Sequence, residues 1–222
     1  MIKFRLLSIF PHILDSYLDE SIIKRALDQK AISIEKYDLR DWTHDRHRTV
    51  DDTPYGGGAG MLMKIEPLYQ ALKDLKKKSR TKKRKVVLLS ASGSTWSQKQ
   101  AKKYSVLDEV VFVCGRYEGV DARIKKYVDA EISIGDYVLT GGELPALVII
   151  DTITRLLPGV LGNAQSIEEE SHSAEKVLEY PQYTRPAVFE ADGKKLKVPS
   201  VLLEGNHAKI KAWREKQQKV KK

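Results

Sequence analysis

The stretch that decides the fold of this chain reads VVLLSASG at residues 86–93, VVFVCGRYEG at residues 110–119 and EISIGDYVLTGGELP at residues 131–145. Each segment begins with a short apolar run and continues into glycine. Such runs are typical of strands that are buried on both faces, as in parallel sheets. Ligands of open α/β sheets bind at the carboxyl ends of the strands, where glycine lets the backbone approach them. Taken singly, each segment could be an ordinary turn, but together they predict one pocket built largely from backbone.

The rest of the chain supplies strands and helices in alternation. We expect further strands at residues 2–10 and 32–39 and helices at residues 11–30, 66–78, 98–104, 121–128 and 145–157. Alternating elements of this kind predict an α/β fold with a mostly parallel sheet that has helices on both faces. Residues 162–175 are polar and acidic and are interpreted as a linker, and the last forty-odd residues end in a helix that Asn206 caps.

The composition is that of a globular protein without a membrane span. Apolar residues make up 41% and charged residues 31% of the 222 residues. The apolar run Leu144–Ile150 is interrupted by Pro145 and is too short to cross a bilayer. The first five residues lack the apolar core of a secretory signal, and Cys114 is the single cysteine, so no internal disulfide is possible. We therefore expect a cytoplasmic protein that does not bind membranes.

Positive charge is concentrated in two tracts. Residues 73–85 contain nine basic residues and one acid, and residues 209–222 contain seven basic residues and one acid, within a net charge of +9 for the chain. Such tracts suit a polyanion, because each phosphate that is neutralised releases counterions. Most lysine runs, however, are solvated linkers or tails. Charge alone leaves both interpretations open.

Three other chemistries fit the sequence poorly. The glycines at positions 56–60 are followed by Met61 rather than by Lys-Ser/Thr, so a nucleotide-hydrolase phosphate loop is a poor match. His44 and His47 lie in a polar loop without a paired metal-ligand spacing, and we expect no metal. Ser90 and Ser92 follow a strand, but the Gly-x-Ser-x-Gly motif of serine hydrolases is absent.

Several longer motifs resemble those of the bacterial tRNA (guanine-N1)-methyltransferases of the TrmD family. They are Val113–Gly119, Ser133–Leu139 with Gly141–Pro145, Pro158–Gly162, Tyr183–Pro186, the loop from His47 to Met61 and the segment Gly205–Ile210. The resemblance covers nearly the whole chain in order. It implies a SPOUT-type knotted domain with a deep trefoil knot at residues 1–161, a linker at residues 162–175 and a small helical tRNA-binding domain at residues 176–222.

The resemblance also implies a cofactor and partners. The cofactor would be S-adenosylmethionine, and the partners would be tRNA and a second copy of the chain in a homodimer with a composite active site. By position in the motifs, the cofactor contacts are Leu89, Ser90, Gly115, Tyr117, Glu118, Ile134, Gly135, Asp136, Tyr137, Val138, Leu139, Gly141, Gly142 and Pro145. Contacts with the substrate would come from His47, Asp51, Gly60 and Ser171.

The implied reaction is methylation of N1 of guanosine 37 in tRNA, with Glu170 and Arg155 as catalytic residues. Guanine N1 carries a proton, which a positioned carboxylate can remove as a general base. A guanidinium can stabilise the negative charge that develops on O6. By position, the base is Glu170, where the family has aspartate, and the cation is Arg155. Ala91 likewise replaces the proline that is usual in the family, which removes a restraint on φ.

Two alternative functions remain at the level of sequence. One is a related knotted methyltransferase that acts on a ribose 2′-hydroxyl; the loop around Asp51 and the segment Tyr183–Pro186 argue against it. The other is a tRNA-binding protein without activity, in which Glu170 marks the loss of catalysis. Cofactor binding and methyl transfer to a tRNA would separate these alternatives.

Overall fold

The computed structural model describes residues 1–162, 171 and 177–220, and these fall into two compact units, Met1–Gly162 and Asn163–Lys222. The first unit is built around a five-stranded sheet with the order β2-β1-β6-β5-β7, and every pairing in it is parallel. This confirms the α/β class and the mostly parallel sheet; the knot stays a prediction. The elements of this unit are β1 (Ile2–Ser8), α1 (Asp15–Leu18), α2 (Ser21–Asp28), β2 (Ile32–Asp38), the 3-10 helix η1 (Leu39–Trp42), β3 (Asp51–Asp52), β4 (Leu62–Met63), α3 (Ile65–Lys78), β5 (Arg84–Thr95), α4 (Gln98–Tyr104), β6 (Glu109–Cys114), the 3-10 helix η2 (Ala122–Tyr127), β7 (Ala130–Ser133) and α5 (Glu143–Thr154).

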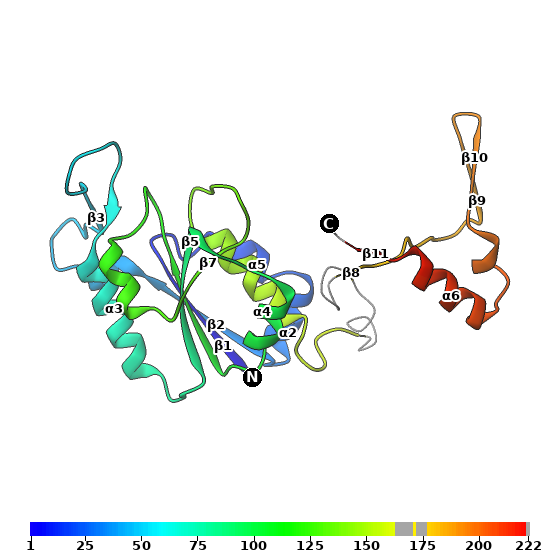
Figure 1. Cartoon of the computed structure of the whole chain (residues 1–222). Coiled ribbons are helices and arrows are strands. Elements are labelled where there is room, and N and C mark those ends of the chain that lie inside the picture. Colours follow the sequence, from blue (N-terminus) through cyan, green and yellow to red (C-terminus); the bar gives the residue numbers. More distant parts are fainter. Residues whose placement is uncertain (163–170, 172–176, 221–222) are drawn as a thin grey trace. The chain divides into compact units, whose positions relative to one another are not determined.

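Two apolar cores cover the two faces of the sheet, because alternate residues of a strand point to opposite sides. On β6, Val110, Phe112 and Cys114 belong to one core, while Val111 and Val113 belong to the other. The first core contains side chains of α2 and α5, and the second contains side chains of α3. Figure 1 shows the same division, with α3 on one side of the sheet and α2, α4 and α5 on the other. The central strands are buried on both faces, which explains their continuous apolar sequence.

Two elements differ markedly from the expectation from sequence, and the helix expected at residues 145–157 runs instead from Glu143 to Thr154 as α5. The helix expected at residues 11–30 is divided into α1 and α2, and Ser21 begins α2 with a φ of +52°. The apolar spacing does not reveal this break, because Leu18 and Ile23 on either side of it enter the same core. The strand expected to end near Ser90 continues to Thr95 in β5, with a register shift between Leu89 and Ser94.

The second unit consists of short elements. They are β8 (Val177–Leu178), β9 (Val188–Ala191), β10 (Lys194–Lys197), the 3-10 helix η4 (Ser200–Leu202), α6 (His207–Gln217) and β11 (Lys219–Val220). The antiparallel β9–β10 hairpin turns at Asp192 and Gly193, which both have positive φ, as the tight hairpin turns require. The cap predicted at Asn206 is confirmed, since its Oδ1 accepts a hydrogen bond from the backbone N of Lys209 at 3.1 Å. No helix among the described residues is long and apolar enough to cross a membrane.

Candidate active site

A cavity of about 440 Å³ lies at the carboxyl ends of β5, β6 and β7. Its volume is in the range of small-molecule sites. Of the residues expected to contact the cofactor, every one except Asp136 lines this cavity. The three strand ends therefore meet at one site, as the glycine pattern indicates. The role of these residues in cofactor binding stays a prediction.

Close packing of backbone explains why glycine is needed around the cavity. A Cβ atom at Gly142 would lie 2.7 Å from Cα of Cys114, and the N of Gly142 donates a hydrogen bond to the O of Gly115 at 2.9 Å. A Cβ atom at Gly93 would lie 2.5 Å from the backbone N of Ile132. Real Cβ atoms do not approach this closely, so the backbones of these strands and loops can meet only where glycine is present.

A buried polar network lies directly beside Gly141. Glu143, at the start of α5, is 1% exposed. Its Oε1 accepts a hydrogen bond from the hydroxyl of Ser8 at 2.5 Å, and its Oε2 accepts one from Nε of Arg116 at 3.0 Å. The guanidinium of Arg116 lies over the ring of Phe10, 4.9 Å from its centroid. A carboxylate this deeply buried needs such partners, so the network connects the end of β1 to both the loop after β6 and the start of α5.

Ser8, Arg116 and Glu143 are not among the site residues predicted from sequence. Arg116 and Glu143 lie inside two of the family motifs, so the motifs could have pointed to them. Ser8 carried no signal, because its partner lies 135 residues away in the sequence.

A second polar cluster lies on the cavity wall, next to the register shift in β5. The hydroxyl of Ser92 donates a hydrogen bond to Oε1 of Glu131 at 2.8 Å, and Nζ of Lys125 lies 2.9 Å from Oε2 of the same carboxylate. Burial would raise the pKa of Glu131, but the hydrogen bonds from Lys125 and Ser92 outweigh it and lower that pKa. The cavity is therefore lined by an ionised carboxylate, which can accept hydrogen bonds from a ligand.

The loop that follows η1 is attached to the cavity wall. The backbone N of Glu118 donates a hydrogen bond to the O of Met61 at 3.1 Å, and the N of Met63 donates one to the O of Gly119 at 3.0 Å. Gly60 has a φ of +86°, and a Cβ atom there would lie 2.4 Å from Cγ of Glu118. Two of the residues expected to contact the substrate, Asp51 and Gly60, thus lie beside residues that line the cavity.

Asp51 also changes the environment of Tyr117. Burial, the negative charge of Asp51 and a hydrogen bond to that carboxylate raise the pKa of the Tyr117 phenol. The phenol is therefore protonated at neutral pH and can donate. His47 is exposed in a turn of the same loop.

The expected catalytic cation lies at the far end of α5. The helix starts at the cavity, where Gly142 and Pro145 line the wall, and Arg155 is its C-cap. A helix of twelve residues is about 18 Å long, so Arg155 does not lie at the cavity of its own chain. Glu170 falls outside the described residues. Ser171 belongs to the second unit, where its hydroxyl accepts a hydrogen bond from the backbone N of Glu179 at 2.9 Å.

Metal chemistry has no candidate site in the described part of the chain. No group of three or more His, Cys, Asp or Glu side chains gathers there in a way that could hold an ion. Cys114 is fully buried, and burial raises the pKa of its thiol well above the ordinary value, so it packs as an apolar residue.

Comparison with known proteins identifies the family. The model of the family described as tRNA (guanine-1)-methyltransferase TrmD matches residues 2–222. A protein of Dictyoglomus turgidum is 50% identical over 217 residues, which are 98% of this chain and 85% of that protein. Proteins of Clostridioides difficile and Staphylococcus carnosus are each 48% identical, over 96% and 99% of this chain and 90% and 86% of their own lengths. All three are named tRNA (guanine-N(1)-)-methyltransferase. With this match along its whole length, the chain belongs to the TrmD family of tRNA (guanine-1)-methyltransferases.

Proposed function

We propose that this protein transfers a methyl group from S-adenosylmethionine to N1 of guanosine 37 in tRNA. The observation that carries the proposal is the cavity at the ends of β5, β6 and β7, lined by the family's glycine motifs. Membership of a family whose members are named tRNA (guanine-N(1)-)-methyltransferase supplies the reaction class.

The cavity fits a compact cofactor of this kind. Its walls at Gly115, Gly141 and Gly142 present backbone groups without side chains, and Glu131 adds an ionised carboxylate that can pair with a cationic or hydroxyl-bearing ligand. When bound, S-adenosylmethionine supplies an activated methyl group. The protein must then hold that group in line with the attacking nitrogen, which is a task of orientation.

The chain's own residues supply the proton transfer. The carboxylate of Glu170 removes the proton from N1 of guanine, so that the nitrogen lone pair can attack the methyl carbon. The guanidinium of Arg155 stabilises the negative charge on O6 as the proton leaves. Backbone hydrogen bonds of Glu118 and Gly119 hold Met61 and Met63 beside the cavity wall, and Tyr117 interacts with Asp51, so that Asp51 and Gly60 can contact a nucleotide that extends from the cavity.

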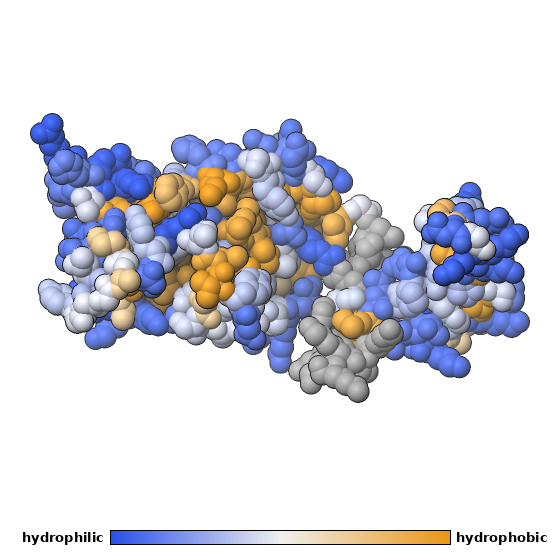
Figure 2. Space-filling view, turned by 90° about the horizontal axis from the view of Figure 1, so that it is seen from above, coloured by the Kyte–Doolittle hydropathy of each residue, from blue (hydrophilic) through white to orange (hydrophobic). Residues whose placement is uncertain are grey.

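The position of Arg155 favours an active site shared between two chains. Because α5 separates Arg155 from the cavity of its own chain, the cation and the cofactor meet only if a second copy supplies one of them. An exposed apolar face of α5 suits such a dimer: Leu144 and Val148, one turn apart, are 59% and 43% exposed. Figure 2 shows that hydrophobic side chains gather on the surface of the first unit. A homodimer buries this face and completes the site.

Mass spectrometry of a tRNA transcript tests the function directly. Incubation with the protein and S-adenosylmethionine should add one methyl group, and nuclease mapping should place it on the base of guanosine 37. A transcript with adenosine at position 37 should remain unmodified. Methylation of a ribose would favour the 2′-hydroxyl alternative, and cofactor binding without transfer would favour a tRNA-binding protein without activity.

A further inference from the structure

The segment that joins α3 to β5 carries the densest charge of the described residues. We call residues 73–85 the basic turn. Nine of its thirteen residues are lysine or arginine and one is an acid, so its net charge is +8. All of the basic side chains except that of Arg84 are exposed. Like charges this close repel one another, which favours the binding of an anion.

Few of these charges are neutralised by the protein. Among the described residues, ion pairs engage only Lys77, whose Nζ lies 3.7 Å from Asp74, and Lys85, whose Nζ lies 4.0 Å from Asp129. Lys73 and Lys78 lie over the rings of Tyr69 and Tyr37. The side chains of Lys76, Arg80, Lys82 and Lys83 have no ion pair, hydrogen bond or ring contact within the described part of the chain. Most of the charge is thus available to a partner.

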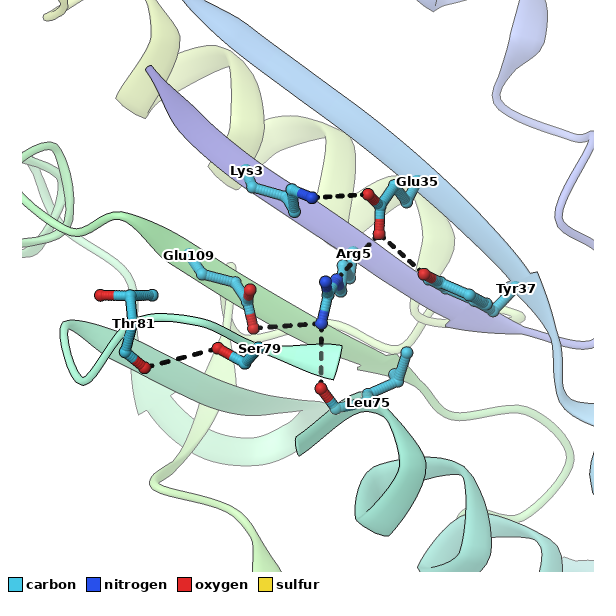
Figure 3. A network of polar contacts seen from close by, with 8 residues as sticks. All are labelled: Lys3, Arg5, Glu35, Tyr37, Leu75, Ser79, Thr81 and Glu109. Atoms are coloured by element: carbon cyan, nitrogen blue, oxygen red, sulfur yellow. Dashed lines mark hydrogen bonds and ion pairs between the residues drawn. The ribbon is translucent and has the colours of Figure 1, made fainter. Parts of the chain in front are cut away.

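A buried network around Arg5 of β1 anchors the basic turn to the sheet, as Figure 3 shows. Nη1 of Arg5 donates a hydrogen bond to the O of Leu75 at 2.9 Å and lies 3.4 Å from Oε1 of Glu109. Arg5 therefore satisfies one of the carbonyl groups that the end of α3 leaves unpaired. A solvated linker has no such anchor.

Hydrogen bonds also fix the turn itself. The hydroxyl of Thr81 donates to Oδ2 of Asp108 at 2.5 Å and accepts from the backbone N of Lys83 at 3.0 Å. The O of Lys83 accepts from the backbone N of Asp108 at 3.0 Å and from that of Glu109 at 3.3 Å. The charges therefore project from an ordered surface, which reduces the entropy lost when a ligand binds.

The basic turn lies at the amino end of β5, and the cavity lies at the carboxyl ends of the strands. β5 starts at Arg84 and reaches the cavity at Leu88 and Leu89, about 13 Å and about 17 Å further along the strand at roughly 3.3 Å per residue. In Figure 1 the turn between α3 and β5 lies at the bottom of the first unit, and the loops that follow β6 and β7 lie at the top. A ligand confined to the cavity cannot reach it.

We propose that the basic turn is an additional RNA-binding surface that contacts backbone phosphates of the tRNA away from the nucleotide in the cavity. The choice of tRNA as the polyanion rests on the proposed function. A membrane surface is the weaker fit, because no large hydrophobic side chain is exposed within residues 73–85 to enter a bilayer. The exposed charges suit a sequence-independent contact that strengthens binding without changing the chemistry.

The test replaces four unpaired charges and measures binding and turnover separately. The variant Lys76→Gln/Arg80→Gln/Lys82→Gln/Lys83→Gln is compared with the matched control Lys24→Gln/Lys30→Gln/Lys99→Gln/Lys103→Gln, in which four exposed lysines elsewhere on the first unit lose the same charge. We expect the basic-turn variant to bind tRNA about tenfold or more weakly near 0.1 M salt, and the slope of log affinity against log salt to fall by roughly 2 to 4. KM for tRNA should rise, whereas kcat and the affinity for S-adenosylmethionine should stay unchanged.

The outcomes separate this inference from the proposed function. Unchanged tRNA affinity and slope in the basic-turn variant overturn the inference, as does an equal loss in the control. Binding of phosphatidylglycerol vesicles that depends on the four residues, with tRNA affinity unchanged, overturns it in favour of a membrane. The variant Lys76→Arg/Lys82→Arg/Lys83→Arg keeps the charge and should keep the affinity. If the unmodified protein does not methylate tRNA, the proposed function fails, whatever the binding data give.

Discussion

Arg116 and Glu143 form an ion pair directly beside Gly141, with Nε of the arginine 3.0 Å from Oε2 of the carboxylate. A Cβ atom at Gly141 would lie 2.2 Å from that nitrogen and 2.5 Å from that oxygen. The pair is 16% and 2% exposed in its two side chains, so it has little room to move away. The shape of the cavity therefore depends on a contact that only glycine permits.

Replacing Gly141 with alanine should disrupt cofactor binding. The added methyl group must displace either the ion pair or the loop, and a shift that costs about 1.4 kcal/mol weakens binding tenfold. We expect calorimetry to show at least about a tenfold loss of affinity for S-adenosylmethionine. Gly162→Ala is the matched control, because an added Cβ there meets nothing within 4 Å, and it should bind normally. Equal affinity in the two variants contradicts the assignment of the cavity.

Removing the base at position 170 should abolish turnover while sparing the cofactor. Glu170→Gln keeps the size of the side chain but cannot accept the proton of N1, so single-turnover methylation should fall by about 10²–10⁴-fold. Glu170→Asp should be active, because aspartate has the same chemistry. Glu169→Gln is the control for register, and a loss as large as that of Glu170→Gln shows that the wrong carboxylate has been chosen.

A mixture of two inactive variants tests the shared active site. Chains carrying Glu170→Gln have an intact cavity, and chains carrying Gly141→Leu, whose larger side chain should abolish cofactor binding, have an intact base. Mixed dimers should recover part of the activity, because one of their two sites combines the intact cavity of one chain with the intact Glu170 of the other. Mixtures that stay inactive after subunit exchange, verified with differently tagged chains, argue for a site within one chain.

Neutralising Asp51 should affect the substrate more than the cofactor. Asp51→Asn removes the negative charge beside Tyr117 at the loop that we expect to contact the nucleotide. We expect kcat/KM for tRNA to fall by about tenfold, the scale of one hydrogen bond to a charged group. The affinity for S-adenosylmethionine should change little. Asp52→Asn is the control, because the carboxylate of Asp52 is exposed and, among the described residues, accepts hydrogen bonds from Thr53 alone. Equal effects of the two substitutions would speak against a specific role of Asp51.

The buried arginine of β1 should be a strong determinant of stability. Arg5→Ala leaves the O of Leu75 and the carboxylate of Glu109 without their partner in a buried place, so the free energy of unfolding should fall by about 3–5 kcal/mol. Lys3→Gln removes a partly exposed pair with Glu35 and should cost less than about 1 kcal/mol. Urea unfolding at neutral pH measures both. Comparable losses would mean that Arg5 is no more important than a surface charge.

Acid should remove the contribution of Glu35. Burial would raise its pKa, but hydrogen bonds from Lys3 and Tyr37 and the charge and hydrogen bond of Arg5 lower it from 4.5 to about 2. Because the folded pKa is depressed, the carboxylate stabilises the fold above pH 4.5, and this contribution is lost as the pH falls toward 2. The difference in unfolding free energy between the unmodified protein and Glu35→Gln should therefore shrink between pH 6 and pH 3. A difference that is constant over this range contradicts the lowered pKa.

The sequence predicted the parts of the fold that depend on local pattern. The core strands were visible because burial on both faces requires continuous apolar residues, as in Val110–Cys114. The α4 helix was predicted with its observed bounds, Gln98–Tyr104. The place of the cavity followed from glycines after the strands, a signal that exists because close backbone packing excludes other residues.

Features that depend on distant contacts were not predictable. The extension of β5 past Leu89 requires pairing with β7, whose Ile132 is the partner of both Leu89 and Ser94. The anchor of the basic turn joins Arg5 to Leu75 across 70 positions, and no periodicity indicates such a bond. The position of Arg155 away from the cavity of its own chain depends on the length and direction of α5, which the sequence pattern does not specify.

A cavity walled by backbone also limits how this protein could escape an inhibitor. Drug resistance usually arises when a side chain in the binding site is exchanged for one that blocks or ignores the compound. At Gly141 and Gly142 any exchange places a Cβ atom inside the contact distance of Arg116 or Cys114, so the change that blocks the compound also disturbs the site. Few single substitutions at these glycines could therefore give resistance to a compound that binds to their peptide groups.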